Sequence, residues 1–129
     1  MQSGKISWAD LTVPDTDKIR DFYKHVVGWE VVATPMGGYD DYSMIRKNEP
    51  NDPIAGICHP RGANGNLPAV WLVYLPVEDL DLSLTRCAES GGKIISGPIS
   101  FSGTSRYAVI QDPSGAYVAL YCKTDSKAA

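Results

Sequence analysis

Two stretches of the chain repeat apolar residues at the spacing of an α-helix. After Pro14-Asp15 they recur at i, i+3, i+4, i+7 and i+8, and a similar row follows Val77. This spacing places each set along one face of a helix. The first set is Ile19, Phe22, Tyr23, Val26 and Val27, and the second is Leu80, Leu84, Cys87 and Ala88.

Residues suited to helix ends flank both stretches. The predicted N-caps are Asp15 or Thr16 for the first helix and Asp79 or Asp81 for the second. Gly28 and the pair Gly91-Gly92 are expected to end the two helices. Short polar side chains accept hydrogen bonds from the first free N–H groups, and glycine adopts the left-handed conformation that closes a helix.

The remaining apolar segments are rich in Val, Leu, Ile and aromatic residues, which is typical of β-strands. One strand precedes each helix and three follow it. The expected strands are residues 6–13, 30–34, 42–46, 54–58, 70–77, 93–95, 106–111 and 116–122. Residues rich in Gly, Pro, Asp and Asn separate them at 35–38, 48–53, 102–103 and 112–115, as expected for turns.

The order strand, helix, three strands occurs twice. An offset of 64 residues aligns Val13-Pro14-Asp15 with Val77-Glu78-Asp79, and an offset of 63 aligns residues 53–58 with residues 116–121. Each half is too small for a good core of its own, so the halves should pack together. We therefore predict one domain over residues 1–129, with repeat one at about 5–59, a linker at about 59–68 and repeat two at about 69–123.

Composition narrows the choice of partners. The net charge of −3 without a basic block argues against a nucleic-acid partner. The longest apolar stretch, residues 69–77, falls short of the roughly 20 residues that a membrane span needs, and the N-terminus lacks the apolar core of a signal peptide. Three widely spaced cysteines predict neither a disulfide framework nor a zinc site. We expect a cytoplasmic protein without a cofactor.

Three motifs resemble those of the vicinal-oxygen-chelate superfamily, which includes glyoxalase I, extradiol dioxygenases, fosfomycin-resistance proteins and bleomycin-binding proteins. They are residues 11–15 with 22–23 and 27–29, residues 91–93 with 97–98, and residues 112–116. In this order the resemblance covers about residues 5–123. It implies an α+β fold in which two βαβββ repeats form a cupped, eight-stranded mixed sheet around a pocket.

The resemblance also implies where metal ligands should stand. Metal enzymes of the superfamily place a His or Glu on the first and fourth strands of each repeat. The equivalent positions here hold Trp8, Gly56, Leu72 and Ala119. None of these side chains binds a metal, and a one-residue error in register offers only Ser7 as a weak ligand. We therefore expect no metal in this chain.

Side-chain alternation along the strands predicts the composition of the pocket. The expected ligand-binding residues are Trp8, Asp10, Thr12, Cys58, Leu72, Tyr74, Ala119 and Tyr121. The third strand of each repeat could add Tyr42 or Met44, and Arg106. Such an apolar, aromatic surface with a few polar groups is typical of small-molecule sites.

Each candidate also has a structural interpretation. Trp8 and Tyr74 are equally explained as core aromatics. Asp10, the one weak catalytic candidate, needs a partner in an apolar strand, and an ion pair with Arg106 or Arg61 would supply it.

Other polar residues are expected to be structural. Cys58 should be a small buried residue, because the neighbouring His59 points to the opposite face and cannot serve as its base. We expect Asp40-Asp41 to form a solvated turn and His25 to lie on the surface.

The preferred hypothesis is a metal-independent, glyoxalase-like protein that binds a small organic molecule in an apolar and aromatic cup. The alternative is a lyase, isomerase or dioxygenase-type enzyme that uses unusual metal ligands such as Asp10 and His59. Such an enzyme could instead use Asp10 as acid or base beside Tyr74 or Tyr121. A third hypothesis is a non-catalytic module that assembles with a partner through an exposed sheet edge or an apolar patch. The resemblance implies a homodimer, and leaves open whether the repeats pair within one chain or across the dimer.

Overall fold

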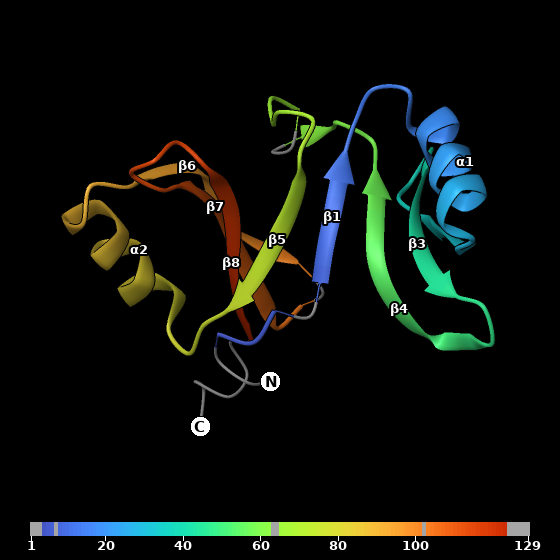
Figure 1. Cartoon of the computed structure of the whole chain (residues 1–129). Coiled ribbons are helices and arrows are strands. Elements are labelled where there is room, and N and C mark those ends of the chain that lie inside the picture. The colour runs from blue at the N-terminus through green and yellow to red at the C-terminus, as the bar shows by residue number, and fades with distance from the viewer. Residues whose placement is uncertain (1–3, 7, 63–64, 102, 124–129) are drawn as a thin grey trace. The chain divides into compact units, whose positions relative to one another are not determined.

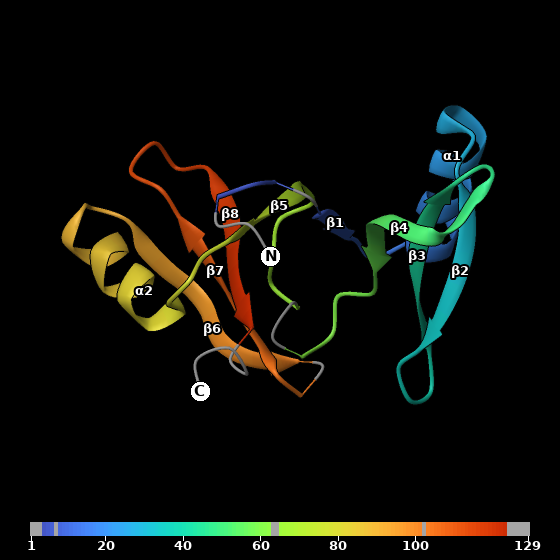
Figure 2. The same ribbon diagram turned by 90° about the horizontal axis from the view of Figure 1, so that it is seen from below.

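A computed structural model describes residues 4–6, 8–62, 65–101 and 103–123 of the chain. Its contacts divide the chain into two compact units. The N-terminal unit comprises Trp8–Trp71, and the C-terminal unit runs from Leu72 onward and includes the first residues of the chain. Each unit has one helix and four strands in the order βαβββ (Figures 1 and 2).

The N-terminal unit contains β1 (Trp8–Thr12), α1 (Thr16–Val27), β2 (Glu30–Pro35), β3 (Asp40–Arg46) and β4 (Glu49–Cys58). Its strands lie in the order β2-β3-β4-β1. β1 pairs with β4 in parallel, whereas the other neighbours are antiparallel. The parallel pair follows from the helical crossover, since α1 and two strands separate β1 from β4 in the sequence.

The C-terminal unit repeats this arrangement. It contains β5 (Trp71–Pro76), α2 (Leu80–Glu89), β6 (Lys93–Phe101), β7 (Ser105–Gln111) and β8 (Tyr117–Lys123). The strand order is β6-β7-β8-β5, with β5 and β8 parallel. The predicted α+β class, with two βαβββ repeats and eight strands in mixed pairing, is therefore confirmed.

The helix ends agree with most of the predicted caps. The side chain of Asp79 accepts a hydrogen bond from the Leu82 amide at 3.1 Å, and Gly28 ends α1 in the left-handed conformation with φ of 85°. At the start of α1, Asp15 makes no capping bond through its side chain. The Thr16 hydroxyl instead donates to the Val13 carbonyl at 2.7 Å, which ties the helix to the end of β1.

Each helix covers one face of the sheet in its own unit (Figure 1). The C-terminal core joins α2 to β7 and β8 through Leu80, Leu84, Ala108, Leu120 and Cys122. The N-terminal core consists of Tyr42, Met44, Ala55 and Ile57, with Tyr23, Trp29, Val31 and Trp71 packed against it. Because side chains alternate, Gly56 and Cys58 lie on the face of β4 that points away from α1.

β4 and β6 extend furthest beyond their predicted bounds. β4 begins at Glu49, so the turn predicted at 48–53 is wrong beyond Asn48, and β6 continues to Phe101 instead of ending at residue 95. β1 pairs with β4 only from Ala55 to Cys58. Pro50 and Pro53 therefore lie where β4 has a neighbour on one side alone, and a strand tolerates a missing N–H donor there.

Neither described helix is long enough to cross a membrane. α1 has 12 residues and α2 has 10, against the roughly 20 that a bilayer requires, and no described helix qualifies as a span.

Candidate functional site

The N-terminal unit gathers several chemically distinct side chains on the sheet face opposite α1. In the parallel pairing of β1 with β4, Asp10 lies beside Gly56 and Thr12 beside Cys58. A Cβ atom at Gly56 would lie 3.1 Å from the Asp10 Cβ, 3.2 Å from the Trp8 Cζ2 and 3.7 Å from the Cys58 Sγ. These three side chains therefore converge over Gly56.

Trp8 and Asp10 contact each other on this face. The indole Nε1 of Trp8 donates to the Asp10 Oδ2 at 3.4 Å, and both residues are half-buried. The hydrogen bond is long, so it orients the two groups rather than binding them tightly. Each residue therefore keeps part of its surface accessible to solvent.

Asp41 of β3 links this face to the segment that follows β4. Its Oδ1 accepts a hydrogen bond from the His59 amide at 2.8 Å, and the His59 Nδ1 lies 3.3 Å from the same oxygen. The Asp41 side chain is only 15% exposed and that of His59 23%. The interpretation of Asp40-Asp41 as a solvated turn is therefore wrong for Asp41, because β3 already begins at Asp40.

Cys58 lies between two carboxylates. Burial, the negative charges of Asp10 and Asp41, and a hydrogen bond to Asp41 together raise the pKa of the Cys58 thiol well above its usual range. Each of these causes disfavours the thiolate. Cys58 is therefore a neutral thiol at physiological pH and a poor nucleophile.

Aromatic side chains surround His59. Its ring packs edge-on against Tyr39 with centroids 5.2 Å apart and lies 6.3 Å from the ring of Tyr42. The guanidinium of Arg61 sits over Tyr39, 4.2 Å from the ring centroid. Sequence reasoning missed Tyr39 and Asp41, because their roles depend on the register between β3 and β4.

The third-strand candidates lie on the helix side of their sheets. Tyr42 and Met44 belong to the core beneath α1, and the Tyr42 hydroxyl donates to Asp17 at 2.6 Å. Arg106 donates two hydrogen bonds to Asp81 of α2, at 3.0 and 3.3 Å. The expectation that these residues join the predicted pocket is therefore wrong, and the ion-pair partner of Arg106 in its own unit is Asp81.

The C-terminal unit has an aromatic face of its own, on the side of its sheet away from α2. Tyr74 of β5 pairs with Ala119 of β8, and its ring lies 6.4 Å from Tyr121 and 6.1 Å from Tyr107. Leu72 alternates onto the same side of β5 as Tyr74. Tyr107, which also packs edge-on against Phe101 at 5.3 Å, was not among the predicted residues.

The four family metal positions do not fit a divalent ion. They hold Trp8, Gly56, Leu72 and Ala119, and the Trp8 ring fills the space in front of Gly56. Within the described ranges, no group of three His, Cys, Asp or Glu residues is placed to hold a metal ion. The oxygen, nitrogen or thiolate donors that a catalytic metal requires are therefore missing from these four positions.

Comparison with known families accounts for this fold. The sequence profile of the glyoxalase/bleomycin resistance protein/dioxygenase superfamily matches residues 5–120. The chain belongs to this superfamily. The resemblance inferred from the three motifs is thereby confirmed.

Curated relatives of the chain are about twice as long. The chain is 32% identical over 130 aligned positions to the anthracycline biosynthesis protein DnrV of Streptomyces peucetius. This alignment covers 93% of the chain and 47% of DnrV. The chain is 30% identical over 122 positions to the putative glyoxylase CFP32 of Mycobacterium bovis, covering 93% and 46% respectively. The chain thus spans about half the length of these relatives.

Solved structures with the same fold include methylmalonyl-CoA epimerases. The Streptomyces coelicolor epimerase, in complex with 2-nitronate-propionyl-CoA, aligns with a TM-score of 0.61 at 17% identity, over 95% of this chain and 99% of the epimerase. The Mycobacterium tuberculosis epimerase gives a TM-score of 0.60 at 17% identity, over 98% and 93%. At this identity the likeness establishes the fold alone.

Proposed function

We propose that this superfamily member binds a small, planar organic molecule, without a resident metal, on the sheet face formed by Trp8, Asp10 and Cys58. The observation that carries the proposal is the half-buried indole of Trp8, which lies over Gly56 within hydrogen-bonding distance of the Asp10 carboxylate. An aromatic plane beside a fixed acceptor is a common arrangement in small-molecule sites.

The chemistry of this face limits what it can bind. The Trp8 ring offers stacking, worth about 0.5–1.5 kcal/mol beyond the area buried. Asp10 and Asp41 are acceptors, and the neutral Cys58 thiol is a weak donor. The matching ligand is an aromatic ring system that carries hydroxyl or amino donors. Two relatives are named for anthracycline biosynthesis, which supports a polycyclic aromatic compound.

The aromatic face of the C-terminal unit is a second candidate contact surface for the same class of ligand. Tyr74, Tyr107 and Tyr121 present adjacent phenol rings there. Leu72 and Ala119 are only 3% and 0% exposed, so contact with a flat ring would come from the half-buried rings of Tyr107 and Tyr121. Thr12, which pairs with Cys58 in the N-terminal unit, belongs to the proposed contact surface of that unit.

Titration with daunorubicin, an anthracycline, tests this function. Purified protein is followed by isothermal calorimetry and by quenching of tryptophan fluorescence. We expect saturable binding, weakened at least about tenfold by Trp8→Ala, which corresponds to about 1.4 kcal/mol. Trp29→Phe, in the core beneath α1, is the matched control and should leave the affinity unchanged. Absence of saturable binding, or equal affinities of Trp8→Ala and the wild type, would overturn the proposal.

Metal independence has its own test. Protein purified without chelator is analysed for bound metals by mass spectrometry, and thermal unfolding is measured with Mn²⁺, Ni²⁺ and Zn²⁺. We expect neither a stoichiometric ion nor a metal-dependent rise in Tm, because binding to the native state alone would raise Tm. An ion held by side chains of this face would contradict the proposal.

An enzyme of the same superfamily is the second candidate function, and one feature favours it. Asp10 is a half-buried carboxylate in contact with Trp8 and close to a neutral thiol, as an acid or base near a bound substrate would be. Asp10→Asn should then abolish turnover of any substrate, whereas Asp15→Asn at an exposed position should not. Unchanged turnover in Asp10→Asn would remove Asp10 from the mechanism. A homodimer and a cytoplasmic location remain predictions.

A further inference from the structure

The imidazole of His59 is held in place directly after β4. Its ring packs edge-on against Tyr39, with centroids 5.2 Å apart, and lies 6.3 Å from the ring of Tyr42. The His59 Nδ1 lies 3.3 Å from the Oδ1 of Asp41, and only 23% of the His59 side chain is exposed. Contacts with three residues therefore restrict the ring to one orientation, as a side chain that recognises a ligand requires.

Asp41 determines which ring nitrogen of His59 carries the proton. An ionised carboxylate only accepts hydrogen bonds, so the His59 Nδ1 donates to Asp41. In a neutral imidazole the other nitrogen, Nε2, is then an acceptor. No described residue hydrogen-bonds to this Nε2, and no buried side-chain nitrogen or oxygen in the described ranges lacks a partner. The Nε2 atom is therefore accessible and available as an acceptor.

The link between β3 and the segment after β4 does not need an imidazole. The shorter of its two hydrogen bonds runs from the His59 backbone amide to Asp41, at 2.8 Å. Any residue except proline supplies that donor. The ring of His59 therefore adds a polar group that the attachment of this segment does not require.

The second repeat shows that the fold does not require the carboxylate either. Gly56 aligns with Ala119 at the offset of 63 residues. Gly56 pairs with Ser43, two residues after Asp41, and Ala119 pairs with the residue two positions after Tyr107. A tyrosine thus stands in the C-terminal unit where Asp41 stands in the N-terminal unit. The pairing of Asp41 with His59 is specific to one unit and is not a requirement of the βαβββ arrangement.

His59 lies beside the sheet face on which Trp8 and Cys58 stand. Asp41 hydrogen-bonds to both the Cys58 thiol and the His59 amide. The Trp8 ring lies over Gly56, which is three residues before His59 in the sequence. Three residues of extended chain cover about 10 Å, which is about the length of three fused aromatic rings.

We propose that the His59 Nε2 accepts a hydrogen bond from a hydroxyl group at the end of an aromatic ligand of three or more fused rings, and that Asp41 holds the tautomer this requires. The inference rests on the proposed function and specifies which group of the ligand is recognised. The ring system stacks on Trp8, and its hydroxyl reaches His59. A ligand of the same shape without the hydroxyl covers Nε2 and leaves it without a partner, which weakens binding. His59 is thus a specificity-determining residue and Asp41 a positioning residue.

Two matched ligands test this recognition. 2-(Hydroxymethyl)anthraquinone and 2-ethylanthraquinone share one three-ring system and carry side arms of nearly equal size, but only the first donates a hydrogen bond. Affinities are measured by isothermal calorimetry at about pH 8, where histidine is ordinarily neutral. We expect the preference for the hydroxymethyl compound to be about three- to tenfold larger in the wild type than in His59→Phe. The phenylalanine keeps an aromatic ring beside Tyr39 and Tyr42.

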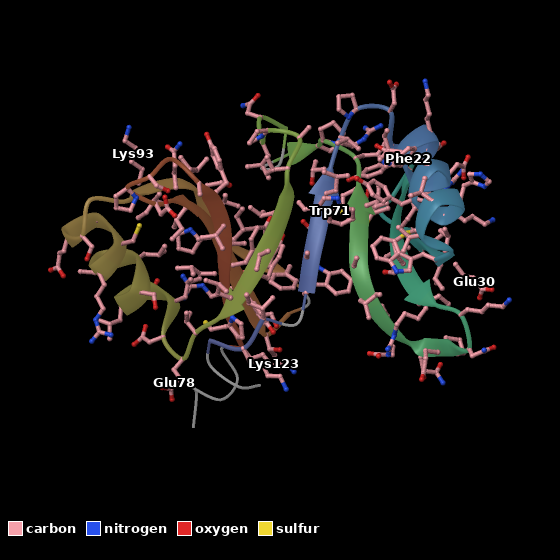
Figure 3. All side chains as sticks on the ribbon, in the orientation of Figure 1. Phe22, Glu30, Trp71, Glu78, Lys93 and Lys123 are labelled. Carbon is pink, nitrogen blue, oxygen red and sulfur yellow. The ribbon has the colours of Figure 1, made fainter. Side chains whose placement is uncertain are left out.

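His25→Phe is the control for the loss of a histidine. His25 is exposed on α1, the helix on which Phe22 is labelled in Figure 3 and which covers the opposite face of the sheet. This variant should keep the wild-type preference. Far-UV circular dichroism and urea unfolding establish that each variant is folded.

The tautomer of His59 gives a second measurement that does not depend on the His59→Phe variant. The chain has two histidines, so nitrogen-15 labelling of histidine gives two sets of ring signals, and His25→Phe assigns them. We expect the His59 proton on Nδ1, and a change in the Nε2 shift when the hydroxymethyl compound is added but not when the ethyl compound is added. In Asp41→Asn, whose amide both donates and accepts, the proton should be shared between the two nitrogens.

Three results would overturn this inference. They are an equal preference in the wild type and His59→Phe, a wild-type His59 that carries its proton on Nε2, and binding of daunorubicin without binding of either anthraquinone. In each case, daunorubicin binding that Trp8→Ala weakens would still support the proposed function. If neither daunorubicin nor the anthraquinones bound, the proposed function and the role of His59 would both be rejected.

Discussion

The ring of Trp8 occupies the space in front of Gly56, where a Cβ atom would lie 3.2 Å from the Trp8 Cζ2. Both residues stand at positions where metal-dependent relatives are expected to carry ligands. In this chain one position holds an indole and the other a glycine, which leaves room for that ring. Trp8 and Gly56 therefore pack against each other, and neither position offers a metal ligand.

Gly56→Val should destabilise the protein. Its added atoms meet Trp8 on one side and the Asp10 Cβ at 3.1 Å on the other, and Gly56 is buried in β4. Overpacking of this kind costs about 1–3 kcal/mol, and urea unfolding should show a loss in that range. In a Trp8→Ala background the same substitution should cost less, since the ring that it meets is gone. Equal costs in both backgrounds would show that the two residues do not compete for this space.

Cys58 predicts a distinct dependence of stability on pH. Its pKa is raised in the folded chain, whereas in the unfolded chain it returns to its usual value near 9.0. The unfolded state therefore loses this proton first. The contribution of Cys58 is fully present below about pH 9 and is lost as the pH rises further.

The wild type should thus lose stability faster than Cys58→Ala above about pH 9, by up to about 1.4 kcal/mol per pH unit. Urea unfolding at several pH values between about 7 and about 10 measures the difference. The other two cysteines are common to both proteins and cancel in the comparison. Parallel stability curves would show that the native thiol ionises as readily as the unfolded one.

Much of the fold could be predicted from the sequence because its signals are local. The spacing of apolar residues defines both helices, and Gly28 and Asp79 mark two of their ends with the expected geometry. Because the sequence repeats, the βαβββ order inferred for one unit also predicts the order in the other. The exposure of Phe22 (52%) and Val26 (61%) on α1 could not be anticipated in this way, since apolar spacing does not distinguish positions that are buried from positions that stay exposed.

The candidate site was harder to predict because it depends on pairing between distant strands. Arg106 was expected on the same face as Tyr121, but β7 and β8 pair Tyr107 with Tyr121 and Arg106 with Cys122. Counting cross-strand pairs outward from the turn at residues 112–115 would have identified Tyr107. Asp41 gave no comparable signal, because its partner His59 is 18 residues away in the sequence.

Asp41→Ala should destabilise the N-terminal unit, whereas Asp40→Ala should not. Asp41 accepts a hydrogen bond from the His59 amide at 2.8 Å and is largely buried. Its neighbour Asp40 is exposed. Loss of a bond to a charged acceptor, with the amide left unpaired, costs about 1–3 kcal/mol, and the exposed substitution should cost less than about 0.5 kcal/mol.

A third variant separates the hydrogen bond from the charge. The amide oxygen of Asp41→Asn can still accept from His59, so this variant should recover part of the stability that Asp41→Ala loses. Urea unfolding of the three variants at one pH provides the comparison. If Asp40→Ala and Asp41→Ala were equally stable, the link from β3 to the segment after β4 would contribute nothing to the fold.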